Sequence, residues 1–475
     1  MGASVKLAAL PTNRVFVLFV VAVAARFAAF GNPAVHADEQ FYFTVAREML
    51  HGAIPYVDIW DRKPLGLFLL FLPGAFLSLS AGVVTFQLIA LACVVATAIL
   101  VARLADLAGW RRGALFAGIA YILWLDVLNG VSGQSPVYYN LLVAGAAWLI
   151  ASRPRRRAAG LVAMALVGCA LQIKYSPLIE GVFFGLWLLR DEWKAGRSLP
   201  KLVGYGAALV AIALLPTALA FGIYVAIGHG NDWIFANMTS ILLRGRDPTE
   251  WQLRYAGQLT LMLLPLIAMT IAGRGEARGG DPHVHRFALV WFGVALFSVA
   301  VFGGWYDHYG LPVALPGALA SAGFMGGRGR RWTPLLLLLV ACFGQYSVGK
   351  RRAGHGDSGQ FSALRRAVGR GPGCLWVYSG DSLLYSASGR CVPTRFYFPP
   401  HLNLGRENGA IGVEQATEVR RILATRPAVI VMRPPFRDEE RPIRAIVSAA
   451  VARDYVRVAE QPMGKEMLSV YRRRP

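Results

Sequence analysis

Long apolar blocks alternate with short polar segments over the first three quarters of this chain. The blocks recur from Val15 to Val348 and then stop. A helix needs about 20 apolar residues to cross the hydrocarbon core of a bilayer. The pattern therefore predicts an all-α polytopic membrane domain over residues 1–349. The polar and mixed segment 350–475 predicts a small soluble α/β domain.

The apolar blocks predict about eleven membrane spans. The first is expected from Val15 to Gly31 and the second from Val83 to Val101. The others are expected at 114–128, 136–151, 158–173, 177–190, 202–227, 257–273, 287–303, 310–325 and 332–348. We find no internal repeat, which weakens a transporter interpretation, because many transporters consist of two related halves.

Arginine and lysine residues gather in alternate loops between these blocks, as in cytoplasmic loops of membrane proteins. The alternation holds only if the apolar stretch Leu65–Leu79 does not span. This stretch is short and contains Pro73, so we expect interfacial helices that lie along the outer leaflet. The N-terminus is then expected in the cytoplasm, and residues 350–475 are expected outside the inner (plasma) membrane of a bacterium-like cell.

The composition agrees with a membrane protein. Hydrophobic residues make up 55% of the 475 residues and charged residues 16%, whereas about a quarter of a soluble globular chain is charged. The formal net charge is +22. Most of the arginines before Lys350 sit in short clusters between apolar blocks, with little interleaving of aromatic and basic residues on a soluble face. These features argue against nucleic-acid binding.

The segment 350–475 shows strand and helix patterns. Strands are expected at Leu375–Tyr378, Ala428–Met432 and Met467–Tyr471, and a helix at Glu414–Thr425. Cys374 and Cys391 fall in this domain; they are either a disulfide or two free thiols, since spacing alone does not decide it.

The first outer loop is the segment richest in polar residues. Asp38 and Glu39 stand where a helix would begin, and apolar residues at Phe41, Val45 and Met49 give that helix one apolar face. An amphipathic helix on the membrane surface is therefore expected, with two carboxylates favoured at its N-terminus by the helix dipole. A helix cap without chemical function is the alternative for Asp38.

Cations and aromatic residues occur in the other segments expected outside. The sequence Asp61-Arg62-Lys63-Pro64 closes the first loop and suits phosphate, either of lipid headgroups in general or of one ligand. Further polar residues lie in short turns: Gln134, Tyr139, Lys174, Asp307, His308 and Tyr309. No motif specific for a metal is present.

The first-loop string resembles the signature of polytopic C-type membrane glycosyltransferases, in the branch of protein O-mannosyltransferases and the aminoarabinose transferase of lipid A. The matching residues are Asp38-Glu39, Tyr42, Ala46-Arg47, Gly52, Pro55-Tyr56 and Asp61-Arg62-Lys63-Pro64. Two further stretches, 171–177 and 308–316, are similar to turns of that family. The family often carries an acidic residue where this chain has Gln134, which puts metal dependence in doubt.

This resemblance implies an inverting glycosyltransferase that uses a polyprenyl-phosphate-linked sugar and a lipid, glycan or protein acceptor. Asp38 would be the general base and Glu39 would position the acceptor or a water. Lys63, Arg62, Lys174 and His308 would bind the donor phosphate. Tyr42, Asp61, Gln134, Tyr139 and Tyr309 would position substrate. The resemblance implies no required cofactor, and the glutamine at position 134 argues against dependence on a divalent metal.

Three other functions remain open at this point. A transporter or flippase of lipid-linked saccharides predicts ionisable residues in the middle of spans, whereas here the charges lie nearly all at loop level. A non-catalytic scaffold would act through residues 350–475. An oligosaccharide polymerase or ligase would use a diphosphate-linked donor.

Overall fold

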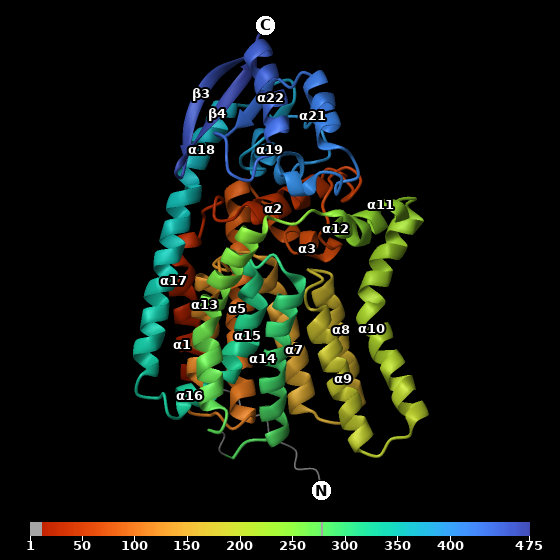
Figure 1. Ribbon diagram of the computed structural model, residues 1–475, viewed down its shortest axis with the longest axis vertical. Helices are drawn as coiled ribbons and strands as arrows, with labels where there is room; N and C mark the ends of the chain where they lie inside the picture. The colour runs from red at the N-terminus through yellow and green to blue at the C-terminus, as the bar shows by residue number, and fades with distance from the viewer. Residues whose placement is uncertain (1–11, 277–278) are drawn as a thin grey trace. The chain divides into compact units, whose positions relative to one another are not determined.

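The computed structural model describes residues 12–276 and 279–475 of a mostly helical chain (Figure 1). The chain divides into two compact units. The described part of unit 1 comprises residues 12–28, 88–219, 248–276 and 279–348. Unit 2 comprises residues 29–87, 220–247 and 349–475.

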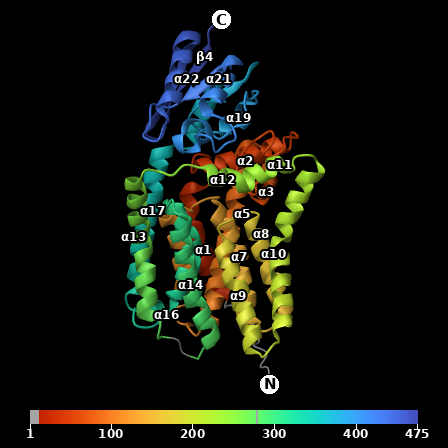
Figure 2. The same ribbon diagram turned by 45° about the vertical axis from the view of Figure 1, so that its right-hand side comes forward.

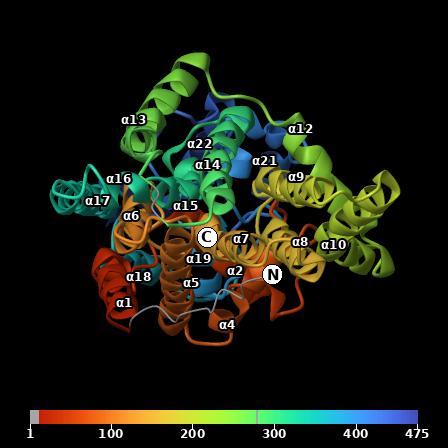
Figure 3. The ribbon, with the colours of Figure 1, turned by 90° about the horizontal axis from the view of Figure 1, so that it is seen from below.

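Unit 1 is a bundle of apolar helices that run side by side (Figures 1 and 2) and are seen end-on in Figure 3. Its helices are α1 (Thr12–Arg26), α6 (Ala114–Val127), α7 (Ser135–Ser152), α8 (Arg157–Leu171), α9 (Leu178–Lys194), α13 (Thr249–Gly273), α14 (Pro282–Phe302), α15 (Leu311–Ala320) and α16 (Ala322–Gly326), with the 3-10 turn η3 (Asp307–Gly310). It also contains most of α5 (Leu79–Leu107), α10 (Leu199–Ala226) and α17 (Thr333–His355). Each predicted span coincides with one of these helices, apart from 310–325, which is divided between α15 and α16.

The helices have the length and surface of membrane spans. Within the described residues, six helical segments are long and apolar enough to cross a bilayer. Large apolar side chains on them remain exposed, for example Val203, Leu214 and Leu219 on α10. In a bilayer such side chains contact lipid, whereas in water they would form an unfavourable apolar surface. The unit thus has the architecture of a multi-pass membrane protein.

The two ends of the bundle differ in charge. The turns at 128–134, 172–177 and 303–310 lie at one end, because successive helices alternate in direction (Figure 1). The other end holds the connections that carry the arginine clusters: Arg111 and Arg112, Arg153 and Arg155 to Arg157, Arg197, Arg274, Arg328, Arg330 and Arg331. The helix arrangement thus separates the polar turns from the basic loops, as the charge pattern predicted.

Unit 2 combines short helices with a small sheet. The helices are η1 (Phe27–Ala29, at the boundary), α2 (Ala37–Met49), α3 (Leu65–Leu69), α4 (Leu72–Ala75), α11 (Gly230–Ile234), the π-turn η2 (Phe235–Thr239), α12 (Ser240–Leu243), α18 (Ser358–Val368), α19 (Leu383–Ser388), α20 (Pro400–Asn403), η4 (Gly405–Glu407), α21 (Gln415–Ala424) and α22 (Arg441–Asp454). The strands are β1 (Leu375–Val377), β2 (Val429–Met432), β3 (Tyr455–Met463) and β4 (Glu466–Arg473).

The sheet has the strand order β1-β2-β4-β3. Strand β1 pairs with β2 in parallel, with Trp376 opposite Ile430. Strands β2 and β3 each pair with β4 in antiparallel register. The predicted strands and the predicted helix at 414–425 are confirmed, and Cys374 and Cys391 form a disulfide. Helices α18 and α22 and the mostly exposed edge strand β3 were not predicted.

One hydrophobic core holds unit 2 together. Trp60, from the first predicted loop, is buried in this core with Trp376 and Ile430 of the sheet and Val447 of α22. Burial of large aromatic side chains contributes much of the stability of such a core. Residues 29–87 therefore fold with residues 349–475, although more than 260 positions separate them in the chain.

The first loop departs from its expected structure in one respect. The segment Leu65–Leu79 forms the short helices α3 and α4, too short to span, as predicted. Helix α2 forms as predicted, but its buried residues are not confined to the apolar face that the sequence indicated. Residues 39–46 are all buried, because α19, α3 and α4 pack around the helix. The amphipathic pattern did not reveal that another segment would cover the polar side.

Candidate functional site

Asp38 lies in the first turn of α2. The Nδ1 atom of His36 accepts a hydrogen bond from the backbone N–H of Asp38 at 3.2 Å and caps the helix. The same Nδ1 atom lies 3.8 Å from the Asp38 carboxylate. The carboxylate is 24% exposed, and the N-terminal dipole favours its ionised form. The cap is thus supplied by His36.

Asp61 is buried next to the beginning of α2. Burial raises the pKa of Asp61, and the charge of Asp38 raises it further, whereas Lys63 and Arg62 lower it. Its Oδ1 lies 3.8 Å from Nε2 of His401, which is longer than a hydrogen bond. Burial holds the pKa of His401 well below its usual value, so this ring is neutral. Asp61 thus lies within electrostatic range of both Asp38 and Lys63.

Lys63 presents an ammonium group without a salt bridge. Its Nζ lies 5.8 Å from the centre of the Tyr42 ring, a cation–π contact. Within residues 12–276 and 279–475, no carboxylate lies within 4 Å of this ammonium group. The Tyr56 hydroxyl donates a hydrogen bond to the Lys63 carbonyl at 2.8 Å and fixes the backbone there. Lys63 can therefore offer its charge to an anionic ligand.

Arg62, the preceding residue, is engaged by protein groups. Its Nη1 forms an ion pair with Glu407 at 2.7 Å, and its Nε and Nη2 donate to the Ser240 hydroxyl. Arg244 forms a second ion pair with Glu407 at 2.7 Å. Glu407 thus joins all three segments of unit 2, and the contacts give Arg62 a structural role. Its predicted phosphate binding stays a prediction.

The predicted residues of unit 1 gather around two turns. Lys174 Nζ lies 5.0 Å from the centre of the Tyr309 ring, and the His308 and Tyr309 rings pack edge to face. The Tyr139 hydroxyl is hydrogen-bonded to Ser176 at 2.9 Å, which ties α7 to the turn that carries Lys174. Gln134 is buried at the start of α7. The structure thus brings together the turns 172–177 and 303–310.

Two residues of the unit 2 cluster escaped the sequence analysis. His401 and Glu407 come from the segment 349–475, and neither lies in a motif. Only the folding of Trp60 into the core of that segment brings them to the first loop. In the described part of the chain, no group of three or more His, Cys, Asp or Glu residues is arranged to hold a metal.

Glu39 and Tyr42 complete the surroundings of Asp38. Both are buried on α2, and Tyr42 packs against Phe68 and Phe71 of the following short helices. The cluster therefore places a partly exposed carboxylate and an ammonium group around one buried acid. Such a pair can accept a proton from a hydroxyl and offset the charge of a phosphate.

Among known proteins, similarity to this chain is found in solved structures. No family model and no curated protein matches the chain. ArnT from Cupriavidus metallidurans in the apo state is 18% identical, with a TM-score of 0.46 over 97% of this chain and 98% of that chain. The same ArnT bound to undecaprenyl phosphate is 16% identical, with a TM-score of 0.42 over 97% of each chain.

A third likeness is to the Archaeoglobus fulgidus oligosaccharyltransferase in complex with zinc and sulfate. It is 14% identical, with a TM-score of 0.45 over 75% of this chain and 55% of that chain. All three TM-scores lie below 0.5.

Proposed function

We propose that the protein is an inverting glycosyltransferase that moves a sugar from a polyprenyl-phosphate donor to an acceptor on the extracytoplasmic face of the inner membrane. The carrying observation is that Asp38 and Lys63 both lie within electrostatic range of the buried Asp61. Transfer from a lipid phosphate needs a base for the acceptor hydroxyl and a cation for the leaving phosphate. This pair supplies both groups.

In the proposed reaction, Asp38 accepts the proton of the acceptor hydroxyl as its oxygen attacks the anomeric carbon. The bond from that carbon to the phosphate oxygen breaks on the opposite face, so the configuration inverts. The negative charge that develops on the polyprenyl phosphate is offset by Lys63. Glu39 is proposed to position the acceptor or a water, and Tyr42 and Asp61 to position substrate.

For the polar residues of unit 1 we propose the roles that the resemblance implies. Lys174 and His308 would contribute positive charge to the donor phosphate. Arg62, which pairs with Glu407, is proposed to do the same. Tyr309, Tyr139 and Gln134 would position substrate. Lys174→Met should then raise the KM for the donor, as Lys63→Met should.

The membrane topology is part of the proposal. About eleven helices are proposed to span, with the N-terminus in the cytoplasm, residues 1–349 as the membrane domain and 350–475 outside. The basic loops at one end of the bundle support this orientation. The Cys374–Cys391 disulfide also supports it, because disulfides persist in oxidising compartments.

The direct test is the Asp38→Asn variant, assayed with a polyprenyl-phosphate sugar as donor. Transfer should fall at least a hundredfold, on the usual scale of general-base effects. Asp58→Asn is the matched control. Asp58 is an exposed acid of the same loop, and its carboxylate accepts a hydrogen bond from the backbone N–H of Ile54 in a local turn. Equal transfer by Asp38→Asn and the control would remove Asp38 from the role.

A further inference from the structure

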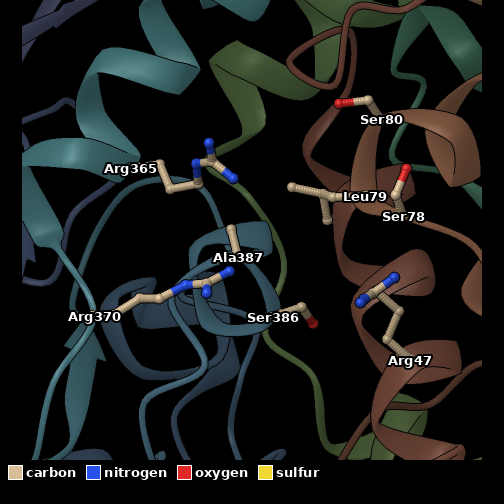
Figure 4. A pocket seen from close by; sticks show the side chains of 8 residues that line it. All are labelled: Arg47, Ser78, Leu79, Ser80, Arg365, Arg370, Ser386 and Ala387. Carbon is tan, nitrogen blue, oxygen red and sulfur yellow. The ribbon is translucent and has the colours of Figure 1, made fainter.

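A second basic site lies at the other end of α2. A pocket of about 330 Å³ within unit 2 is lined by three arginines, three serines and two small or apolar side chains (Figure 4). Its lining residues are Arg47, Ser78, Leu79, Ser80, Arg365, Arg370, Ser386 and Ala387. Nine positions separate Asp38 from Arg47, so the two sites are about 14 Å apart along the helix.

The arginines of this pocket face one another without acidic partners. Arg365 and Arg370 extend from one side, and Arg47 from the other (Figure 4). In the part of the chain that the structure describes, no carboxylate lies within 4 Å of any of the three guanidinium groups. Arg47 donates only to the carbonyls of Ala75 and Leu77, and its buried Nε has no hydrogen-bond partner. Three converging cations repel one another unless an anion lies between them.

Hydroxyl groups add neutral donors to these cations. Ser78 and Ser80 stand at the start of α5, whose positive dipole end also favours an anion. Ser386 donates a hydrogen bond to Glu48 at 3.3 Å. Guanidinium groups together with hydroxyl donors match the oxygens of a phosphate group, which arginine binds through paired hydrogen bonds.

A second basic hollow continues this pocket. It is lined by Arg365, Arg366, Gly369, Arg370, Ala387 and Ser388, and has a volume of about 210 Å³. Next to the first pocket in the chain, Phe76 and Leu77 are 73% and 45% exposed. Exposed apolar side chains beside a cationic pocket are the arrangement that receives both the tail and the headgroup of a lipid.

We infer that this arginine pocket binds a phosphate group, and that the phosphate belongs to the headgroup of an anionic phospholipid. The inference is independent of the proposed sugar transfer, because none of the pocket residues takes part in it. A soluble phosphate compound has the same binding chemistry and is the second source to be tested.

The test uses the full-length protein in detergent and native mass spectrometry. The probes are phosphatidylglycerol, phosphatidylcholine and glycerol phosphate. The pocket variant is Arg365→Gln with Arg370→Gln, two exposed residues without protein partners, so the fold should persist. The matched control is Arg420→Gln with Arg441→Gln, two exposed arginines of the same segment outside the pocket.

The wild type and the control should bind phosphatidylglycerol at least tenfold more tightly than phosphatidylcholine, and the pocket variant should lose this preference. Suppose that the wild type and the control bind glycerol phosphate, the pocket variant does not, and none of the three proteins prefers one lipid. The phosphate bound in the pocket would then belong to a soluble compound. Equal binding of every probe by the wild type and the pocket variant, with unchanged melting temperatures, would overturn the inference.

Discussion

Arg62 and Lys63 are chain neighbours of the same charge whose surroundings differ. Lys63→Met removes an ammonium group that has no salt bridge and keeps a stem that packs near Tyr42. We expect kcat/KM for the donor to fall about tenfold to a hundredfold, on the scale of a lost charge contact to an anion, with no change in melting temperature. Donor titrations and thermal unfolding of the detergent-solubilised protein measure the two quantities.

Arg62→Met should differ from Lys63→Met in its effect on stability and serves as the comparison. It removes one of the two arginines that pair with the buried Glu407. Breaking a buried ion pair destabilises by about 3 kcal/mol or more, so the melting temperature should fall. If Lys63→Met lowered the melting temperature as much as Arg62→Met, the assignment of Lys63 to the ligand rather than to the fold would be wrong.

The charge of Glu407 should make unit 2 sensitive to acid. Burial opposes its ionised form, but Arg244 and Arg62 lower the pKa of Glu407 to about 2. Because the pKa of Glu407 is lower in the folded state, its ionised carboxylate contributes its full stabilisation at pH values above its pKa in the unfolded chain, near 4.5. This contribution, about 3 kcal/mol, is lost as the pH falls from 4.5 through 2.

Glu407→Gln tests this dependence. At pH 7 the variant should melt below the wild type, because two arginines lose their carboxylate partner. Between pH 4.5 and pH 2 the wild type should lose stability as Glu407 becomes protonated. The variant should lack this part of the loss. Parallel curves of melting temperature against pH for the two proteins would show that Glu407 does not cause it.

The residues of the site could be predicted from the sequence only in part. Asp38, Tyr42, Asp61 and Lys63 stand within one short string, so the motif was visible, and the structure brings them together. His401 and Glu407 could not be found, because they reach the cluster only through tertiary packing of a distant segment. The pairing of Arg62 with Glu407 was hidden for the same reason.

At the scale of elements, α13 and α16 approach so closely that only glycine fits between them. A Cβ atom on Gly273 would overlap the backbone of Gly323 and Phe324. Gly273→Ala should therefore force the helices apart and destabilise by about 1–3 kcal/mol, the usual cost of overpacking. Thermal unfolding of the purified variant measures the loss.

Gly257→Ala is the matched control on the same helix. A Cβ atom there meets no other atom within 4 Å, and alanine favours helix over glycine by up to about 1 kcal/mol. This variant should melt at or slightly above the wild-type temperature. A Gly273→Ala protein as stable as the control would mean that α13 and α16 have room to separate.

The elements themselves followed well from the sequence, and the exceptions have physical reasons. Apolar blocks of span length predicted the helices of unit 1, because a segment in lipid must satisfy its own backbone hydrogen bonds, as a helix does. Strand β3 was missed because it is an edge strand with most of its side chains exposed, which leaves little alternation to detect. The burial of α2 was missed because periodicity reports one apolar face and not what covers the other.

At the scale of the whole molecule, the sequence predicted the apolar helices and a boundary near residue 350 between a membrane domain and a C-terminal domain. The compact units of the structure combine residues 349–475 with 29–87 and 220–247. No local pattern marks such an association, since it depends on Trp60 entering a core formed by strands far away in the chain.

The proposal depends finally on the side of the membrane that residues 36–64 face, and cysteine labelling in intact cells tests this. Cys93, Cys169 and Cys342 are free thiols and would first be replaced by serine. Single cysteines at Asp58 and at Arg330, both exposed, then report the first loop and one basic loop of the bundle. Because basic loops stay in the cytoplasm, a membrane-impermeant maleimide should label the cysteine at 58 and not the one at 330. The opposite result would place Asp38 and Lys63 in the cytoplasm, away from the proposed acceptor, and the transfer reaction on the outer face would be ruled out.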